Sequence, residues 1–206
     1  MTRWRARVAG LAVLLVAWGL VLPSELAPFS AHMTAHMAVV AIAAPLLAIG
    51  LRGTPIDLGA RVRLSAIAAS MLEGVVVWAW HAPALHRAAA EHALVAVAEQ
   101  ATFLAAGLAL WMSALGGATQ RERAPASVVA LLTTSMHMTL LGALLALTSR
   151  RLFAHGAGCD PWLHPVHDQQ LGGAIMIVLG GGAYLTGGLW ITARVLFRAP
   201  AGDGPR

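Results

Sequence analysis

The chain has 206 residues, of which 58% are hydrophobic and only 11% are charged. Its mean hydropathy is +0.72. A soluble domain of this size needs a charged surface that the composition cannot supply, so an ordinary soluble domain is excluded. The 14 basic residues are all arginines and stand at the ends of apolar runs. That placement is typical of membrane proteins rather than of a nucleic-acid-binding patch, so no nucleic-acid partner is expected.

Six apolar segments are punctuated by prolines and glycines, and a transmembrane helix needs about 20 predominantly apolar residues. The sequence therefore predicts an all-α polytopic bundle of about six transmembrane helices, forming a single transmembrane domain over residues 1–206. The predicted spans are residues 7–22, 31–50, 64–80, 93–115, 126–148 and 171–197. The first segment, with Ser24 and Ala27 after it, also has the form of a cleavable signal peptide, whose removal would leave five spans.

Arginine counts predict the orientation. With the N-terminus in the cytoplasm, the outer loops hold only Arg87, Arg150 and Arg151, and the other arginines fall on cytoplasmic segments. Membrane proteins concentrate positive charge on the cytoplasmic side. Both termini are therefore expected to be cytoplasmic.

The histidines lie toward the opposite side of this topology. One, His137, is inside the fifth predicted span, and the others lie in the outer loops or at an outer helix end. These are His32, His36, His81, His86, His92, His155, His164 and His167. Such a bias indicates a site that faces the outside of the membrane.

The most informative motif is His32-Met33-Thr34-Ala35-His36-Met37. Residues four apart share a helix face, so His32 and His36 form one stripe and Met33 and Met37 a second. A further group of the same residue types, Met136-His137-Met138, lies in the fifth span. Imidazole suits several transition metals and thioether selects Cu(I), so the pattern favours a copper site. The alternative is that the methionines only fill space between helices.

Carboxylates and a further histidine provide candidate supporting groups. Glu73 and Glu99 lie inside the third and fourth spans at similar depth, and each needs a partner or a proton there. They could bind metal, orient a histidine, or form an interhelical hydrogen bond. Asp168 precedes the last span and is expected to cap its N-terminus, with His167 beside it. His155, Cys159 and His164 form a looser candidate cluster.

Several of these motifs, taken in order, resemble the caa3-type cytochrome c oxidase assembly factor family, called CtaG. The resemblance covers roughly residues 28–190. The matching elements are His32-Met33 with His36-Met37, Ala44-Pro45-Leu46, Trp80-His81 with Pro83, Met136-His137-Met138 with Gly142, and Asp168-Gln169-Gln170-Leu171-Gly172-Gly173. This family is distinct from the single-span copper chaperone that shares its name.

The resemblance implies a multi-pass protein of the bacterial plasma membrane that helps copper reach cytochrome c oxidase. Its implied partners are the oxidase subunits and a periplasmic copper donor, besides the lipid bilayer. The family-like polar positions are His32, His36, His81, His137 and Asp168. The chain departs from the family pattern at His86, where many relatives have an aromatic residue, and at Gln100, where a histidine is common. The chain is also short for a family that often has seven spans.

Two other functions remain open at this point. A membrane b-type haem protein could use His36 and His137 as axial ligands. A copper transporter would need ligands along the whole path, whereas the candidate ligands stop near mid-membrane. No nucleophile constellation, nucleotide loop or redox cofactor motif stands out, so an enzyme is not expected.

Overall fold

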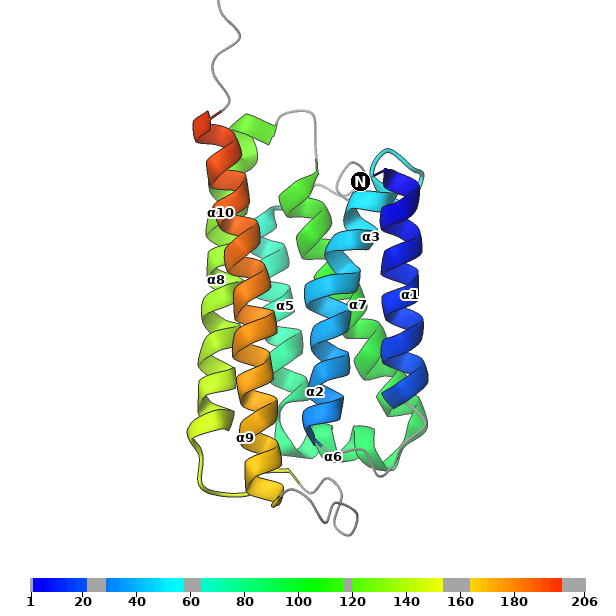
Figure 1. Ribbon diagram of the computed structural model, residues 1–206, viewed down its shortest axis with the longest axis vertical. Coiled ribbons are helices and arrows are strands. Elements are labelled where there is room, and N and C mark those ends of the chain that lie inside the picture. Colours follow the sequence, from blue (N-terminus) through cyan, green and yellow to red (C-terminus); the bar gives the residue numbers. More distant parts are fainter. Residues whose placement is uncertain (1, 22–28, 58–63, 117–119, 154–163, 198–206) are drawn as a thin grey trace, which may run out of the picture.

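The computed structural model describes residues 2–21, 29–57, 64–116, 120–153 and 164–197. The elements within these ranges are all helical, and most run along one common axis (Figure 1). In chain order they are α1 (Arg3–Val21), α2 (Phe29–Met37), η1 (Ala38–Ala43), α3 (Ala44–Leu51), α5 (Ala66–Trp80), α6 (Pro83–Glu91), α7 (Ala93–Leu115), α8 (Gln120–Leu147), α9 (Pro165–Ile175), η2 (Met176–Gly181) and α10 (Gly182–Phe197). The predicted all-α membrane bundle is confirmed.

Helices cover the described part of each predicted span to within two residues. The segments α2–η1–α3 and α9–η2–α10 are each continuous, with a π-helical stretch in the middle. Four segments are long and apolar enough to cross a membrane, namely 29–51, 93–115, 123–147 and 165–197. Helix α5 is a shorter apolar helix of 15 residues. The number of six spans remains a prediction, and Ser24 and Ala27 lie outside the described residues.

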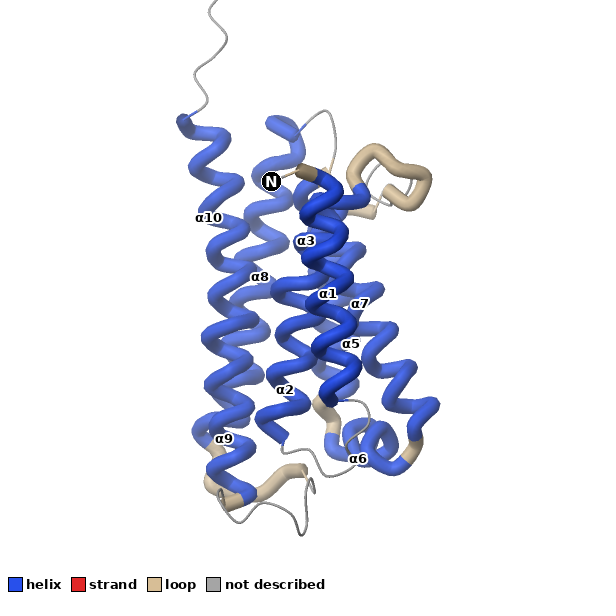
Figure 2. Tube along the Cα trace, turned by 45° about the vertical axis from the view of Figure 1, so that its right-hand side comes forward, coloured by secondary structure: helices blue, strands red, loops and turns tan. Residues whose placement is uncertain are grey.

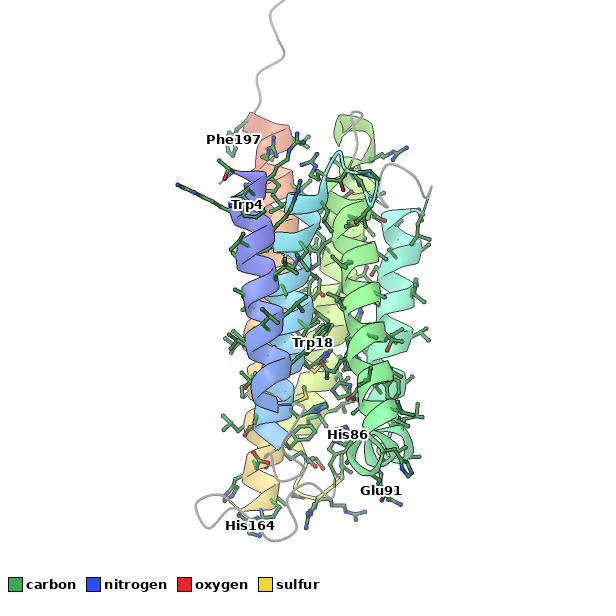
Figure 3. All side chains as sticks on the ribbon, turned by 90° about the vertical axis from the view of Figure 1, so that its right-hand side faces the viewer. Trp4, Trp18, His86, Glu91, His164 and Phe197 are labelled. Carbon is green, nitrogen blue, oxygen red and sulfur yellow. The ribbon has the colours of Figure 1, made fainter. Side chains whose placement is uncertain are left out.

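The two ends of the bundle differ in chemistry. Trp4 and Phe197 lie at one end, which we call the arginine end, and His86 and His164 lie at the other, which we call the histidine end (Figure 3). The start of α1 and the end of α10 therefore share one end, as the arginine pattern predicts. The guanidinium of Arg7 donates to the Gly50 carbonyl over 2.7 Å at the close of α3, which satisfies a carbonyl that the helix leaves unpaired.

Helix α6 crosses the histidine end of the bundle and was not predicted (Figure 2). It begins at Pro83, a residue favoured at the first helical position because its missing N–H is not needed there. Its nine residues are mostly polar or small and do not form an apolar run long enough for a membrane span. From the sequence they are therefore expected to form a loop. The helix nonetheless turns His86 inward and leaves Arg87 and Glu91 exposed.

The continuous segment α2–η1–α3 forms the centre of the bundle. Helices α1, α7 and α9 all pack against it. Its fully buried side chains include Met33, His36, Met37, Val39, Val40, Ala43, Ala44 and Ala48. The His/Met motif of residues 32–37 therefore lies at the start of the most buried of the described membrane-length segments.

Glycines allow α8 and α9 to approach each other closely. A Cβ atom added at Gly173 would lie 2.6 Å from the carbonyl oxygen of Gly142 and from the amide nitrogen of Ala146. Real Cβ atoms do not come this near to backbone, so this contact requires glycine. Small residues serve this purpose between membrane helices, where close packing replaces the hydrophobic effect.

We predict that Gly173→Ala destabilises the folded bundle, because one added methyl group must push α8 and α9 apart. Overpacking of this kind costs about 1–3 kcal/mol. The measurement is the unfolding midpoint in detergent, followed by circular dichroism. Gly182→Ala is the matched control, because its Cβ would meet open space. Equal effects of the two substitutions would contradict this account of the α8–α9 contact.

Candidate metal-binding site

Five polar side chains from four helices gather at the histidine end of the bundle. His32 and His36 come from α2, and His81 follows the last residue of α5. His86 comes from α6 and Glu99 from α7. We call these five residues the polar cluster. It divides into an inner pair, His36 and His81, and an outer group, His32, His86 and Glu99.

The inner pair consists of two buried imidazoles whose rings are tilted by 52° to each other. The ring centroids of His36 and His81 are 5.6 Å apart. His36 is fully buried and neither of its ring nitrogens has a hydrogen-bond partner. The ring of Phe103 lies against it, with centroids 3.7 Å apart. His36 therefore presents two unsatisfied nitrogens inside the protein.

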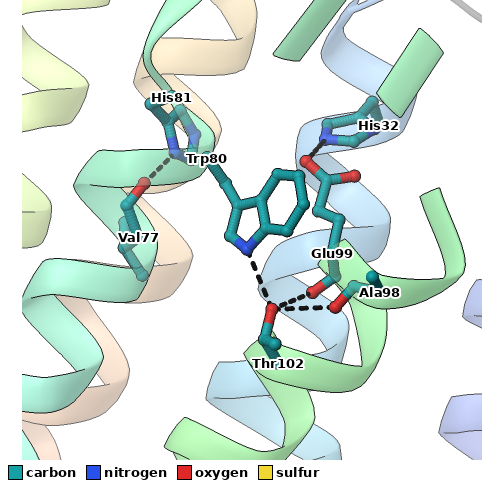
Figure 4. Close-up of polar contacts among 7 residues, drawn as sticks. All are labelled: His32, Val77, Trp80, His81, Ala98, Glu99 and Thr102. Carbon is teal, nitrogen blue, oxygen red and sulfur yellow. Dashed lines mark hydrogen bonds and ion pairs between the residues drawn. The ribbon is translucent and has the colours of Figure 1, made fainter. Parts of the chain in front are cut away.

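The orientation of His81 leaves its second nitrogen available. Its Nδ1 lies 2.7 Å from the Val77 carbonyl oxygen, and because a carbonyl can only accept, Nδ1–H is the donor (Figure 4). In the neutral ring Nε2 then carries a lone pair. Burial lowers the pKa of His81 to about 4, so the ring is neutral at pH 7. Only a neutral imidazole can bind a metal ion.

The outer group combines two imidazoles with a carboxylate. One ligand atom each from His32, His86 and Glu99 lie within 4.8 Å of one another. The Nε2 atom of His32 is 3.5 Å from Oε1 of Glu99, as Figure 4 shows. The His32 and His86 rings meet edge to face with centroids 5.1 Å apart. Glu99 is only 2% exposed.

A hydrogen bond holds the ends of α5 and α7 together beside the cluster. The indole Nε1 of Trp80 donates to the Thr102 hydroxyl over 2.8 Å. Trp80 immediately precedes His81, and Thr102 lies one turn from Glu99 on α7 (Figure 4). This contact fixes the distance between the His81 and Glu99 backbones.

Asp168 positions α2, which corrects the expectation that it caps its own helix. Its carboxylate accepts the backbone N–H groups of Phe29 over 2.6 Å and of Ser30 over 3.1 Å. These are the first residues of α2, so Asp168 caps that helix from α9. The N-cap of α9 is His164 instead. Asp168 thereby sets the start of the turn that carries His32.

The two glutamines after Asp168 also have structural partners. The Gln169 side chain accepts from Leu152 N–H over 2.8 Å and donates to the Arg150 carbonyl over 3.2 Å. The Gln170 amide donates to the Thr148 carbonyl over 3.2 Å. This part of the chain therefore attaches α9 to α2 and to the segment that follows α8.

The buried methionines of α2 pack against glycines of the last long helical segment. Met33 faces Gly172, and Met37 lies beside Gly180, next to Met138. These thioethers fill the space that the glycines of α9 and η2 leave open. Met136 is 66% exposed on the outside of the bundle. A ligand role for these thioethers remains a prediction.

Glu73 and His137 occupy other parts of the interior. Glu73 is fully buried and accepts a hydrogen bond from the Tyr184 hydroxyl. It precedes His81 by eight residues, or about 12 Å along α5. His137 packs against Gly74, and neither of its ring nitrogens has a hydrogen-bond partner. Neither residue joins the polar cluster.

The remaining predicted site residues lie at the surface or beyond the described ranges. His167 is exposed, with its ring 5.6 Å from that of His164. His155 and Cys159 lie outside the described residues. His86 is the residue that sequence reasoning missed as a site member. The available signal was Pro83 three residues earlier, which predicts a helix start and hence a defined face for His86.

Together, the helical bundle and the cluster enclosed at one end define a polytopic membrane protein with candidate metal ligands. The family profile described as "Cytochrome c oxidase caa3 assembly factor (Caa3_CtaG)" matches residues 1–197. The chain belongs to this family, as its motifs predict. Comparison with curated proteins and with solved structures gives no match.

We predict that Asp168→Ala lowers the free energy of unfolding by about 1–2 kcal/mol, because α2 loses the acceptor for two of its free N–H groups. Asp168→Asn retains one carbonyl acceptor and should cost less. The measurement is thermal unfolding in detergent. An alanine variant as stable as the wild type would contradict the capping role.

Proposed function

We propose that this assembly factor supplies copper to cytochrome c oxidase and holds Cu(I) between His36 and His81. Membership of the family supports the oxidase as the destination. The metal proposal rests on His36, which is fully buried with two unpartnered ring nitrogens. Such a group costs free energy unless something binds it. A metal ion shared with Nε2 of His81 would satisfy one of these nitrogens.

The charge of the inner pair favours Cu(I) over a divalent ion. Both ligands are neutral, so they do not offset the charge of the bound ion, which lies in the protein interior. A buried charge without a counter-charge is costly, and the cost rises steeply with its magnitude. Cu(I) carries the smaller charge and accepts low coordination numbers. Imidazole is a suitable ligand for copper, and thioether ligands are therefore not required.

The position of the inner pair suits delivery on one side of the membrane. The arginine bias supports a periplasmic location for the histidine end, in the plasma membrane of a bacterium. Copper would come from a periplasmic donor and pass to oxidase subunits in the same membrane. The proposed role is binding and transfer rather than catalysis of a chemical reaction.

Two observations count against the alternative functions. A haem would need His36 and His137 on opposite sides of one macrocycle, but His36 packs against Phe103 and His137 packs against Gly74. A transporter would need ligands beyond His36. Along the central segment, the thioether of Met37 packs beside Gly180, and residues 38–51 carry no metal-ligating side chain.

We predict that the purified protein retains Cu(I) under reducing conditions and that His36→Ala and His81→Ala each weaken this binding by about 10-fold or more. Removal of a ligand should cost at least as much as removal of a supporting residue, which costs about 10–100-fold. The measurement is competition with a colorimetric Cu(I) chelator. His92→Ala is the matched control, because His92 is exposed at the same end. Unchanged affinity in both inner-pair variants, with folding intact by circular dichroism, would overturn the proposal.

In cells, deletion of the gene should yield cytochrome c oxidase with a lowered copper-to-haem ratio, because copper supply fails while the subunits are still made. Wild-type protein should restore the ratio and the double variant His36→Ala/His81→Ala should not. The measurement is metal and haem analysis of the purified oxidase. Less oxidase with a normal ratio would instead indicate a scaffold that holds subunits together.

A further inference from the structure

We propose that the outer group of His32, His86 and Glu99 is a separate site for a divalent transition-metal ion, with Cu(II) as its preferred occupant. This site differs from the inner pair in its ligands and its charge. Its use in copper supply rests on the proposed function. Its ability to bind a divalent ion does not.

The geometry of the outer group is that of a three-ligand site. Its nitrogen and oxygen ligand atoms already lie within 4.8 Å of one another. Metal–ligand bonds to nitrogen and oxygen are about 2.0–2.2 Å long, so an ion near the centre can reach all three after small side-chain rotations. The Oε1 atom of Glu99 is buried, makes no hydrogen bond and lies 3.5 Å from Nε2 of His32. An ion could bind between these two atoms.

Charge distinguishes the outer group from the inner pair. The outer group contains a carboxylate, which offsets one charge of a divalent ion. Two imidazoles and one carboxylate are nitrogen and oxygen ligands that suit Cu(II) and Zn(II) and lack the soft sulfur that selects Cu(I). Among divalent ions of this series, a given site of this kind binds Cu(II) most tightly.

His32 is the most exposed residue of the polar cluster. His32 is 14% exposed at its side chain, whereas His36, four residues further along α2, is fully buried. One helical turn, about 5.4 Å, separates their levels. The His32/His36 pair, which looks like one site in the sequence, is thus divided between two sites of different chemistry.

Aromatic rings hold His86 in place from the other side. The Phe153 ring lies 4.5 Å from that of His86, and the Phe29 ring lies 5.6 Å away, both edge to face. Phe29 and Phe153 stack on each other at 4.8 Å. These rings come from the start of α2 and from the segment after α8. They keep the His86 imidazole directed at His32.

The test compares Cu(II) and Cu(I) binding by the full-length protein in detergent micelles. Cu(II) is added in air without reductant, and its retention is measured by metal analysis after desalting, with electron paramagnetic resonance to detect nitrogen ligands.

His86→Phe and Glu99→Gln are the main variants. The phenylalanine keeps a ring against Phe29 and Phe153, and the glutamine keeps the shape of the glutamate. All proteins carry His164→Ala/His167→Ala, which removes an exposed histidine pair that could itself bind Cu(II).

The expected result is stoichiometric Cu(II) in the parent protein with coupling to two nitrogens. His86→Phe should weaken Cu(II) binding by about 10–100-fold or more and reduce the coupling to one nitrogen. Glu99→Gln should weaken Cu(II) binding and leave both nitrogen couplings. His92→Ala should change neither, and His36→Ala should weaken only Cu(I) binding.

Two results would overturn this inference. One is a parent protein that retains no Cu(II). The other is Cu(II) binding unchanged in His86→Phe and Glu99→Gln, which would locate the ion elsewhere. If His36→Ala loses Cu(I) binding but keeps Cu(II) binding, the result supports both sites. A protein that binds Cu(II) through His86 but never binds Cu(I) would disprove the proposed function and leave this inference standing.

Discussion

The carboxylate of Asp168 carries the interaction on which the site depends. It joins the start of the last long helical segment to the first two residues of α2. In lipid no water is available to satisfy the free N–H groups at a helix start, so a protein group must do so. Because α2 begins the central segment, this one acceptor fixes the level at which His32 and His36 meet α5, α6 and α7.

The fold was predictable where a single physical requirement dominates. A transmembrane span must be apolar and about 20 residues long. This requirement predicted both ends of α7 correctly and both ends of α2–η1–α3 to within two residues. Helix α6 was missed because it crosses the end of the bundle and need not be apolar. The π-helical segments were also missed. In η1 the Val40 carbonyl accepts hydrogen bonds from Trp111 and Tyr184 of other helices, and such tertiary contacts leave no local pattern in the sequence.

The candidate site was predictable in part, for a related reason. Spacing along one helix showed that His32 and His36 share a face, but it could not show which helices that face meets. The methionine stripe illustrates the limit. Met33 and Met37 are offset from the histidines by about 100° around α2, which is enough to turn them toward glycines of α9 and η2. His86 and Glu99 joined His32 only through contacts between helices that are distant in the sequence.

The apolar run that follows His36 limits the routes by which a bound ion could exchange. Along the central segment residues 38–51 carry no metal-ligating side chain, and Glu73, deeper in the bundle, accepts a hydrogen bond from Tyr184. The central segment therefore offers an ion bound at the cluster no further ligand toward the arginine end. If the ion leaves by the route through which it entered, a donor and a recipient would have to approach the histidine end in turn. Such a protein would work by alternating partners, and excess of either partner would slow the transfer.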